Sequence, residues 1–331
     1  MLSLSRRTLA AAVALGTVAG GMLVAAPAIA LDPRPGDFAT WHEYPTATPG
    51  GTLATIATDA ADNIWYSDPL DNQIVRVPSA SPSTPRSYDL GAGWPGVSSL
   101  AVGADGSIWF DDFVNGAIGH LDPVTGVVES FPLFAATDWA SSLVAGPEGS
   151  VWFGDPVNGR IDAISPSGSI TGIPEPSGAA IVDLVAAADG RLWYTKNTGP
   201  ELGSYDPRTG TFESYPVPVG EFTGLALSNT GDLWVAGIDT LLRVRLDGSI
   251  AASVALPPSP AGYTAPRHLI AGVDTELHFT DYAMGIGTVD SAGHVRYTRP
   301  PFTDSAPDRL AVTSYGSLWY TDAVRNTLGN V

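Results

Sequence analysis

A tryptophan returns along this chain at a nearly constant spacing, and that spacing constrains the fold more than any other feature. Neighbouring members of the series are 41 to 44 residues apart until the last gap of 85, with His278 near its middle; the series is Trp65, Trp109, Trp152, Trp193, Trp234 and Trp319. Self-similarity at about 40–50 residues is typical of proteins built from one repeated supersecondary unit. If His278 fills the missing position, the chain contains seven units.

Each unit has the same internal order of apolar runs and turns. In the unit that begins at Leu100, a short apolar run meets the turn Asp105-Gly106, and a second run carries Trp109 and Phe110. Glycine supplies the positive φ that a tight hairpin needs. A third apolar run and then a fourth, which ends at Pro132, follow. The pattern predicts four antiparallel strands in each unit.

Seven such units predict an all-β fold, a seven-bladed β-propeller of four-stranded blades. The last unit ends at Val331 after its third strand, whereas Thr40–Pro45 matches the fourth strand Thr211–Pro216 of another unit. We therefore expect an N-terminal strand to complete the last blade. Such closure removes free sheet edges. The tryptophans themselves are expected to pack between neighbouring blades.

The first thirty residues differ from the rest of the chain. They combine Arg6 and Arg7, an apolar stretch and the ending Ala28-Ile29-Ala30, which is the pattern of a secretory signal peptide. We expect residues 1–30 to be removed, by the twin-arginine or the general export route, and residues 31–331 to form one secreted domain. No other apolar run is long enough to span a membrane.

The charge and the cysteine content of the chain exclude several classes of function. The chain has 34 acidic and 16 basic residues, a net charge of −18, and no cysteine. An acidic surface repels phosphate backbones, so we expect no nucleic-acid partner. Disulfides, zinc-thiolate centres and thiol catalysis are excluded. The closed ring needs no partner for stability, which predicts a monomer.

Two positions of the repeat carry polar residues. Three residues after the tryptophan position stand Asp68, Asp112, Asp155, Lys196, Gly237, Asp281 and Asp322; ten before it stand Thr55, Ser99, Ser142, Asp183, Gly224, His268 and Arg309. If each hairpin has a two-residue turn, every residue of the first series faces the residue of the second series that belongs to the same unit. Directly opposed residues on antiparallel strands interact. One interpretation is structural, because each carboxylate can bond within its own blade. The other is catalytic at His268, since Asp281 beside it would raise the imidazole pKa and suit a general base.

The funnel at the same face suggests further site residues. Trp94 and Trp139 lie where a fourth strand leads into the next inner strand, and with Arg267 and Lys196 they are the predicted ligand-binding residues. Several carboxylates around one funnel repel each other, and a hard divalent cation relieves that repulsion. Asp308 and Asp322 are the predicted ligands, for Mg²⁺ or alternatively Ca²⁺.

The repeated Asp/Glu-Gly-Ser/Arg-Ile/Leu-Trp-Phe/Tyr-x-Asp, followed by Ile-Gly, resembles the streptogramin B (virginiamycin B) lyase family over residues 37–331. The resemblance implies a seven-bladed propeller that opens cyclic depsipeptides by magnesium-dependent elimination. The family's base His corresponds to Asp308, and its second His to Arg267, one step from His268. Its metal-binding Glu corresponds to Asp322, and another family Glu corresponds to Ala306. Neither His is present here, and one carboxylate is lost.

Three functions are compatible with these residues. The first is a secreted propeller that binds a peptide, glycan or other small molecule in its funnel without turnover. The second is a magnesium-dependent carbon–oxygen lyase, in which His268, Asp281 and Asp308 are catalytic and Asp322 holds the metal. The third is a calcium-dependent lactonase on the same scaffold.

Overall fold

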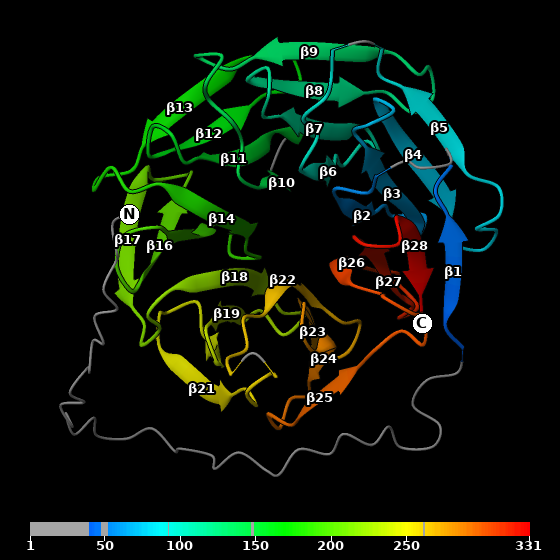
Figure 1. Cartoon of the computed structure of the whole chain (residues 1–331). Coiled ribbons are helices and arrows are strands. Elements are labelled where there is room, and N and C mark those ends of the chain that lie inside the picture. The colour runs from blue at the N-terminus through cyan, green and yellow to red at the C-terminus, as the bar shows by residue number, and fades with distance from the viewer. Residues whose placement is uncertain (1–39, 48–51, 92, 147–148, 261) are drawn as a thin grey trace, which may run out of the picture.

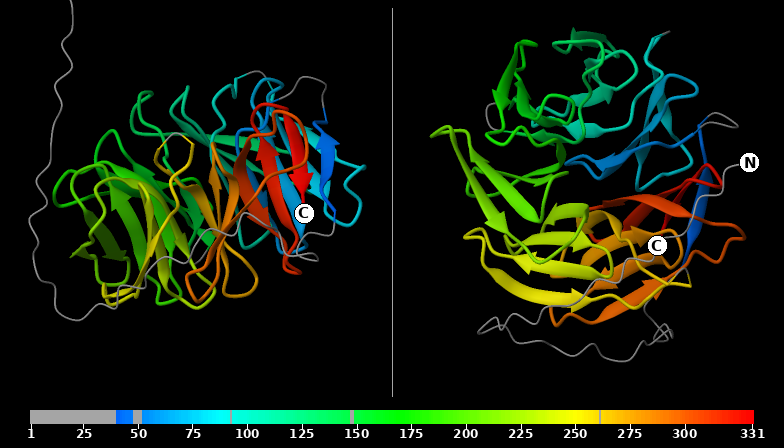
Figure 2. Two further views of the ribbon diagram at one scale, coloured as in Figure 1. Left: turned by 60° about the horizontal axis from the view of Figure 1, so that its bottom comes forward. Right: turned by 60° about the vertical axis from the view of Figure 1, so that its left-hand side comes forward.

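The computed structural model describes residues 40–47, 52–91, 93–146, 149–260 and 262–331. These residues form seven separate sheets, each of four antiparallel strands, arranged as blades around a central axis (Figure 1). Figure 2 shows the same ring obliquely. The predicted seven-bladed, all-β architecture is confirmed.

Every blade runs from an inner strand at the axis to an outer strand at the rim. The first three blades consist of β2 (Ile56–Thr58), β3 (Asn63–Asp68), β4 (Gln73–Pro78) and β5 (Arg86–Asp89); β6 (Leu100–Val102), β7 (Ile108–Asp112), β8 (Ala117–Leu121) and β9 (Val128–Pro132); and β10 (Leu143–Ala145), β11 (Val151–Asp155), β12 (Arg160–Ile164) and β13 (Ile170–Pro174). The next three consist of β14 (Ile181–Ala186), β15 (Leu192–Lys196), β16 (Glu201–Asp206) and β17 (Thr211–Pro216); β18 (Phe222–Leu227), β19 (Leu233–Gly237), β20 (Thr240–Val244) and β21 (Ile250–Ala255); and β22 (Arg267–Ala271), β23 (Leu277–Asp281), β24 (Gly285–Val289) and β25 (Val295–Thr298).

The seventh blade joins the two ends of the chain. It contains β26 (Pro307–Val312), β27 (Leu318–Asp322) and β28 (Thr327–Asn330), and its outer strand is β1 (His42–Pro45). β1 pairs antiparallel with β28, from His42 opposite Asn330 to Pro45 opposite Thr327 (Figure 1). The predicted closure by an N-terminal strand is therefore confirmed.

The tryptophan positions form the contacts between blades. Trp65 of the first blade packs with Phe110 and Ile108 of the second, and Trp319 of the seventh packs with Ile64 and Tyr66 of the first. In four blades the aromatic residue after the tryptophan position covers a glycine of the third strand: a Cβ on Gly119, Gly203, Gly287 or Gly329 would lie 2.0–2.2 Å from the ring of Phe110, Tyr194, Phe279 or Tyr320. This close approach explains the repeated Ile-Gly of the sequence.

The hairpin register differs from the predicted one by one residue. Leu100 lies opposite Phe110 and Val102 opposite Ile108, so Ser99 does not face Asp112. The loop is longer than two residues: Gly103 pairs with Ser107 around Asp105-Gly106, and Gly106 has a φ of 83°. A type I turn followed by a left-handed glycine has this form. Because side chains alternate along a strand, a slip of one residue places the two polar series on different faces.

The predicted signal segment, residues 1–30, lies outside the residues that the structure describes, and secretion stays a prediction. Within the described ranges, no helix is long and apolar enough to cross a membrane.

Candidate functional site

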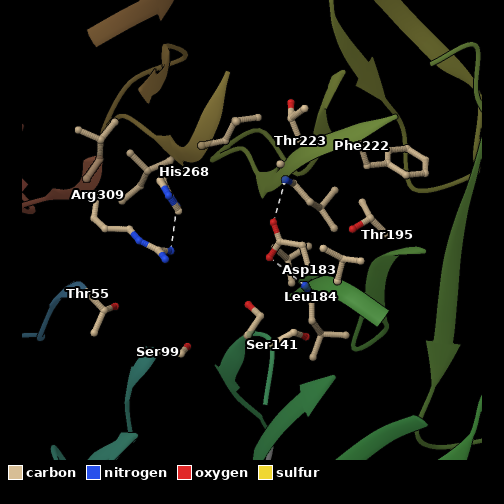
Figure 3. Close-up of a pocket in the computed structure, with 18 of the residues that line it drawn as sticks. Thr55, Ser99, Ser141, Asp183, Leu184, Thr195, Phe222, Thr223, His268 and Arg309 are labelled. Carbon is tan, nitrogen blue, oxygen red and sulfur yellow. Dashed lines mark hydrogen bonds between the residues drawn. The ribbon is translucent and has the colours of Figure 1, made fainter. Parts of the chain in front are cut away.

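A cavity of about 390 Å³ opens where the inner strands begin, at the centre of the ring (Figure 3). This volume lies within the range of small-molecule sites, about 300–1,000 Å³. Its wall is rich in hydroxyl groups, those of Thr55, Ser98, Ser99, Ser141, Ser142, Thr195 and Thr223. Its charged or titratable side chains are Asp183, His268 and Arg309.

Two β-bulges place the basic residues in this cavity. In β22, Arg267 lies opposite Thr280 and Ile270 opposite His278, so His268 and Leu269 together face one residue. His268 has a φ of 46° in the left-handed region, which is uncommon for a residue other than glycine. The same irregularity occurs in β26 at Asp308 and Arg309. Bulges of this kind re-aim side chains and are frequent beside functional sites.

Arg309 and His268 meet across two neighbouring blades. Arg309 Nη1 donates a hydrogen bond to His268 Nδ1 at 2.8 Å (Figure 3). A nitrogen that accepts carries no proton, so the imidazole is neutral with its hydrogen on Nε2. His268 Nε2 lies 3.6 Å from Asp308 Oδ1. Burial, together with the charge of Arg309, lowers the pKa of His268 despite Asp308.

This geometry corrects two expectations about His268. The predicted pairing with Asp281 is wrong, because the bulge in β22 shifts the register and the carboxylate beside the imidazole is Asp308. The predicted rise of the His268 pKa is also wrong, because burial outweighs the carboxylate.

Asp308 joins the groups around the mouth of the cavity. Its Oδ1 accepts a hydrogen bond from the Tyr282 hydroxyl at 3.1 Å, and its Oδ2 lies 3.7 Å from Arg309 Nε. The guanidinium of Arg267 lies over the Tyr282 ring, 5.4 Å from its centre. Arg267 and Arg309 thus contribute two positive charges on this side of the funnel, and Asp308 contributes one negative charge.

Asp183 lies on the other side of the cavity (Figure 3). Its carboxylate accepts the backbone N–H of Leu184 and of Leu225, both at 3.0 Å. Burial raises the pKa of Asp183 to about 6, although these hydrogen bonds and the charge of Arg309 act in the opposite direction. The funnel is therefore basic at β22 and β26 and acidic at β14.

The predicted carboxylates at the ends of the second strands bond within their own blades. Asp281 accepts the N–H of Ala283 and Met284 at 2.8 Å and that of Ala265 at 3.1 Å. Asp322 accepts the N–H of Val324, Arg325 and Ala306 and the hydroxyl of Ser305, and it is buried. Its predicted pairing with Arg309 is wrong, because the residue opposite Asp322 is Pro307.

The predicted ligand-binding residues other than Arg267 also have structural partners or lie outside the cavity. Lys196 faces Ile181, not Asp183; it is buried, and its ammonium lies 3.0 Å from Glu175 Oε1. Trp94 is buried edge-on against Phe110, whereas Trp139 is 38% exposed. Of all residues predicted for the site, only His268 lines the cavity itself.

The sequence of this chain matches a known protein family. The model of the virginiamycin B lyase family matches residues 39–261. The chain belongs to this family. No curated protein matches it in sequence.

Solved structures agree in fold. A streptogramin B lyase structure superposes with a TM-score of 0.79 at 22% identity, covering 88% of this chain and 96% of that one. A catalytically inactive virginiamycin B lyase from Staphylococcus aureus, crystallised with quinupristin, gives 0.78 at 20% identity, covering 88% and 98%. Hydrazine synthase from Kuenenia stuttgartiensis gives 0.72 at 12% identity, covering 87% and 96%. At these identities the likeness concerns the fold alone.

The match to the virginiamycin B lyase family ends at residue 261, before β22 and β26, which carry His268, Asp308 and Arg309. At the position that corresponds to the family's metal-binding Glu, Asp322 accepts hydrogen bonds from four protein donors, and at the position of another family Glu stands Ala306. Across the described ranges, no three His, Asp or Glu side chains are grouped so that they could hold a metal ion. These residues do not fit the family's magnesium.

The sequence analysis missed the roles of Arg309 and Asp183. Both belong to the polar series ten residues before the tryptophan position, so a signal was present, but the assumed register paired them with Asp322 and Lys196. Tyr282, which bonds to Asp308, carried no repeated signal at all.

Proposed function

We propose that this chain is a binding propeller whose central funnel takes an organic carboxylate. The observation that carries the proposal is the hydrogen bond from Arg309 to the neutral His268. A guanidinium has five donors in a planar fork that matches a carboxylate, and its charge is strongest toward a ligand when no protein carboxylate cancels it. His268 holds the side chain in place without neutralising it, and Asp308, 3.7 Å from Nε, offsets only part of its charge.

The charge distribution supports a ligand with one negative charge. Arg267 and Arg309 outweigh Asp308 at one side, but Asp183 and the acidic chain as a whole oppose a highly charged anion. A phosphate carries close to two charges at neutral pH, whereas a carboxylate carries one. The Ser99 hydroxyl of the wall, whose oxygen accepts the N–H of Leu143, has its proton available as a further donor.

Binding of N-acetylglycine, compared with N-acetylglycinamide, tests this proposal by isothermal titration calorimetry. We expect the acid to bind and the amide to bind at least about 10-fold more weakly, and the Arg309→Gln variant to lose the difference. Arg208→Gln is the matched control, because Arg208 is an exposed arginine paired with Asp206 away from the funnel. Equal binding of acid and amide would contradict the proposal.

Family membership favours a second candidate, the predicted carbon–oxygen lyase. The donor set described above opposes it, since Asp322 has no lone pair left for a metal and His268 Nδ1 already accepts from Arg309. Incubation with a streptogramin B depsipeptide and Mg²⁺, followed by mass spectrometry, separates the two functions. A linear product of unchanged mass with a dehydro residue, lost in the presence of EDTA, would establish the lyase; an intact ring supports the binding propeller.

A further inference from the structure

Exposed apolar side chains gather on the face at which the funnel opens. In each antiparallel blade the start of the inner strand, the end of the second, the start of the third and the end of the fourth lie at one edge. Among the described residues, eleven of the sixteen exposed large apolar side chains lie at this edge or in its connections: Leu70, Phe113, Val114, Phe134, Trp139, Val157, Val182, Ile238, Tyr263, Tyr282 and Val324. We call these eleven residues the apolar rim.

Three members of the apolar rim adjoin the cavity. Val182 lines it and is 46% exposed. Trp139 precedes the lining residue Ser141 by two positions. Tyr282 donates to Asp308, the carboxylate beside His268 and Arg309. Concentration of exposed apolar surface on one face marks an interaction site.

The wall of the cavity, which lies inside the apolar rim, is polar. Hydroxyl groups from several inner strands surround the space in front of Arg309. Ser98 already donates to Asp111, and Ser141 to the carbonyl of Ile181. The Ser99 hydroxyl instead accepts the N–H of Leu143, so an alkyl chain placed there would leave its proton without a partner, which is unfavourable. Amide groups, which both donate and accept, satisfy such a hydroxyl. The funnel therefore suits a ligand that is polar along its buried part and apolar outside.

From this arrangement, and resting on the proposed carboxylate function, we infer that the ligand is a linear peptide bound by its C-terminus. The terminal carboxylate meets Arg309, the last amide groups meet the hydroxyls, and apolar side chains further along the peptide lie on the apolar rim. A cavity of about 390 Å³ has room for the last few residues of a peptide, so the remaining residues of a longer chain extend over the face. Charge complementarity and the polar wall together favour a peptide over a fatty acid or a neutral ring.

Three probes of stated structure test this inference by calorimetry: N-acetyl-Leu-Ala-Ala as the free acid, the same peptide as its C-terminal amide, and dodecanoate. We expect the free acid to bind at least about 10-fold more tightly than either of the others. It should also bind more tightly than N-acetylglycine, because it reaches the apolar rim.

A pair of surface variants tests the contribution of the rim. Trp139→Ser should weaken the acid peptide about 3- to 10-fold while leaving N-acetylglycine unchanged. Tyr315→Ser is the control, because Tyr315 is an exposed aromatic residue (61%, against 38% for Trp139) in a hairpin on the opposite face. Both variants leave the cavity lining intact, so unfolding is not expected to confuse the result.

The outcomes separate this inference from the proposed function. Tighter binding of dodecanoate than of the acid peptide overturns the peptide inference but leaves carboxylate binding standing. Binding of the amide as tightly as the acid overturns both. An acid peptide no tighter than N-acetylglycine, with no effect of Trp139→Ser, overturns the role of the apolar rim.

Discussion

The guanidinium of Arg309 is held by the imidazole of His268, with Nη1 donating to Nδ1 at 2.8 Å. The two residues come from neighbouring blades and stand at matching β-bulges of β22 and β26. Thr280 of β23 connects the same two strands, because its hydroxyl lies 2.8 Å from the carbonyl oxygen of Asp308 and 3.2 Å from that of Arg267. A neutral acceptor orients the arginine without cancelling its charge, which is the property that a site for a carboxylate needs.

Loss of the acceptor at His268 should weaken carboxylate binding. We expect His268→Ala to reduce the affinity for N-acetylglycine about 10-fold, because Arg309 is no longer fixed, with little change in the melting temperature. His268→Asn should recover most of the affinity, since asparagine supplies an acceptor oxygen and tolerates a positive φ. Calorimetry and thermal unfolding of both variants check this. Equal losses in the two variants would argue against a positioning role.

Affinity for a carboxylate should rise as the pH falls. Asp183 faces Arg309, whose charge is also influenced by Asp308 and Asp111, and burial raises the Asp183 pKa to about 6. Below this value Asp183 becomes neutral and stops competing for Arg309, whereas a peptide carboxyl, with a pKa of about 3.5, stays ionised. Burial lowers the pKa of His268, so its imidazole stays neutral to a lower pH than an exposed histidine would.

We therefore expect several-fold tighter binding at about pH 5.5 than at about pH 7.5, measured by calorimetry with N-acetylglycine. Asp183→Asn should flatten this dependence and bind at neutral pH as the parent protein binds at low pH. An affinity that falls on acidification would show that Asp183 is not the competing group.

Buried carboxyl groups with raised pKa values should favour the folded state at mildly acidic pH. Burial raises the pKa of Asp111 to about 6 and that of Asp162 to about 7, well above the unfolded value of about 3.9. Between about pH 4 and pH 6 these two groups hold protons in the native state that they have released in the unfolded state, so their contribution to the free energy of unfolding falls as the pH rises. His278, whose pKa burial lowers to about 4, contributes with the opposite sign in this window. Urea unfolding at several pH values measures the slope.

Asp111→Asn isolates one contribution to this slope. Oδ1 of Asp111 accepts the N–H of Ser98 and Ser99, and Oδ2 accepts the Ser98 hydroxyl at 2.8 Å, so an asparagine can keep all three bonds when that hydroxyl turns to accept. We expect the variant to be more stable by roughly 1–3 kcal/mol at about pH 7.5, with a gain that shrinks toward pH 4. Glu129→Gln, at an exposed carboxylate, is the control. A destabilised Asp111→Asn at neutral pH would refute the assignment.

Replacement of His278 by tryptophan should stabilise the ring. His278 occupies the position that tryptophan fills in the other blades, and a second cavity of about 270 Å³ lies beside it, lined among others by Thr288, Val312 and Leu318. His278 Nδ1 lies 3.0 Å from the Thr288 hydroxyl, and burial lowers the His278 pKa to about 4. The larger indole fills empty space at the cost of this one bond.

We expect His278→Trp to raise the melting temperature by a few degrees, corresponding to about 1 kcal/mol. His294→Trp, at a largely exposed histidine of the same blade, should have little effect. A lower melting temperature for His278→Trp would mean that its neighbours cannot accommodate the indole.

The sequence predicted the fold because the repeat records packing directly. Trp65 and its counterparts mark the blade interfaces, and the strand-like segment around Tyr44 revealed the closure. The candidate site was harder to predict from the sequence, because it depends on a hairpin register that differs by one residue from the assumed one. The bulges that bring His268, Asp308 and Arg309 together have no local signal in the sequence, since they arise from pairing with β23 and β27.

The pairing of β1 with β28 has a consequence for how the protein is made. Among the described residues these are the first and last strands, so the ring cannot close until β28 has been synthesised. Contacts of such large sequence separation form slowly, and a strand edge that is still unpaired is prone to aggregation. Closure of the seventh blade is therefore a vulnerable step in the folding of this protein, and loss of β1 or of β28 should leave it with an open sheet edge.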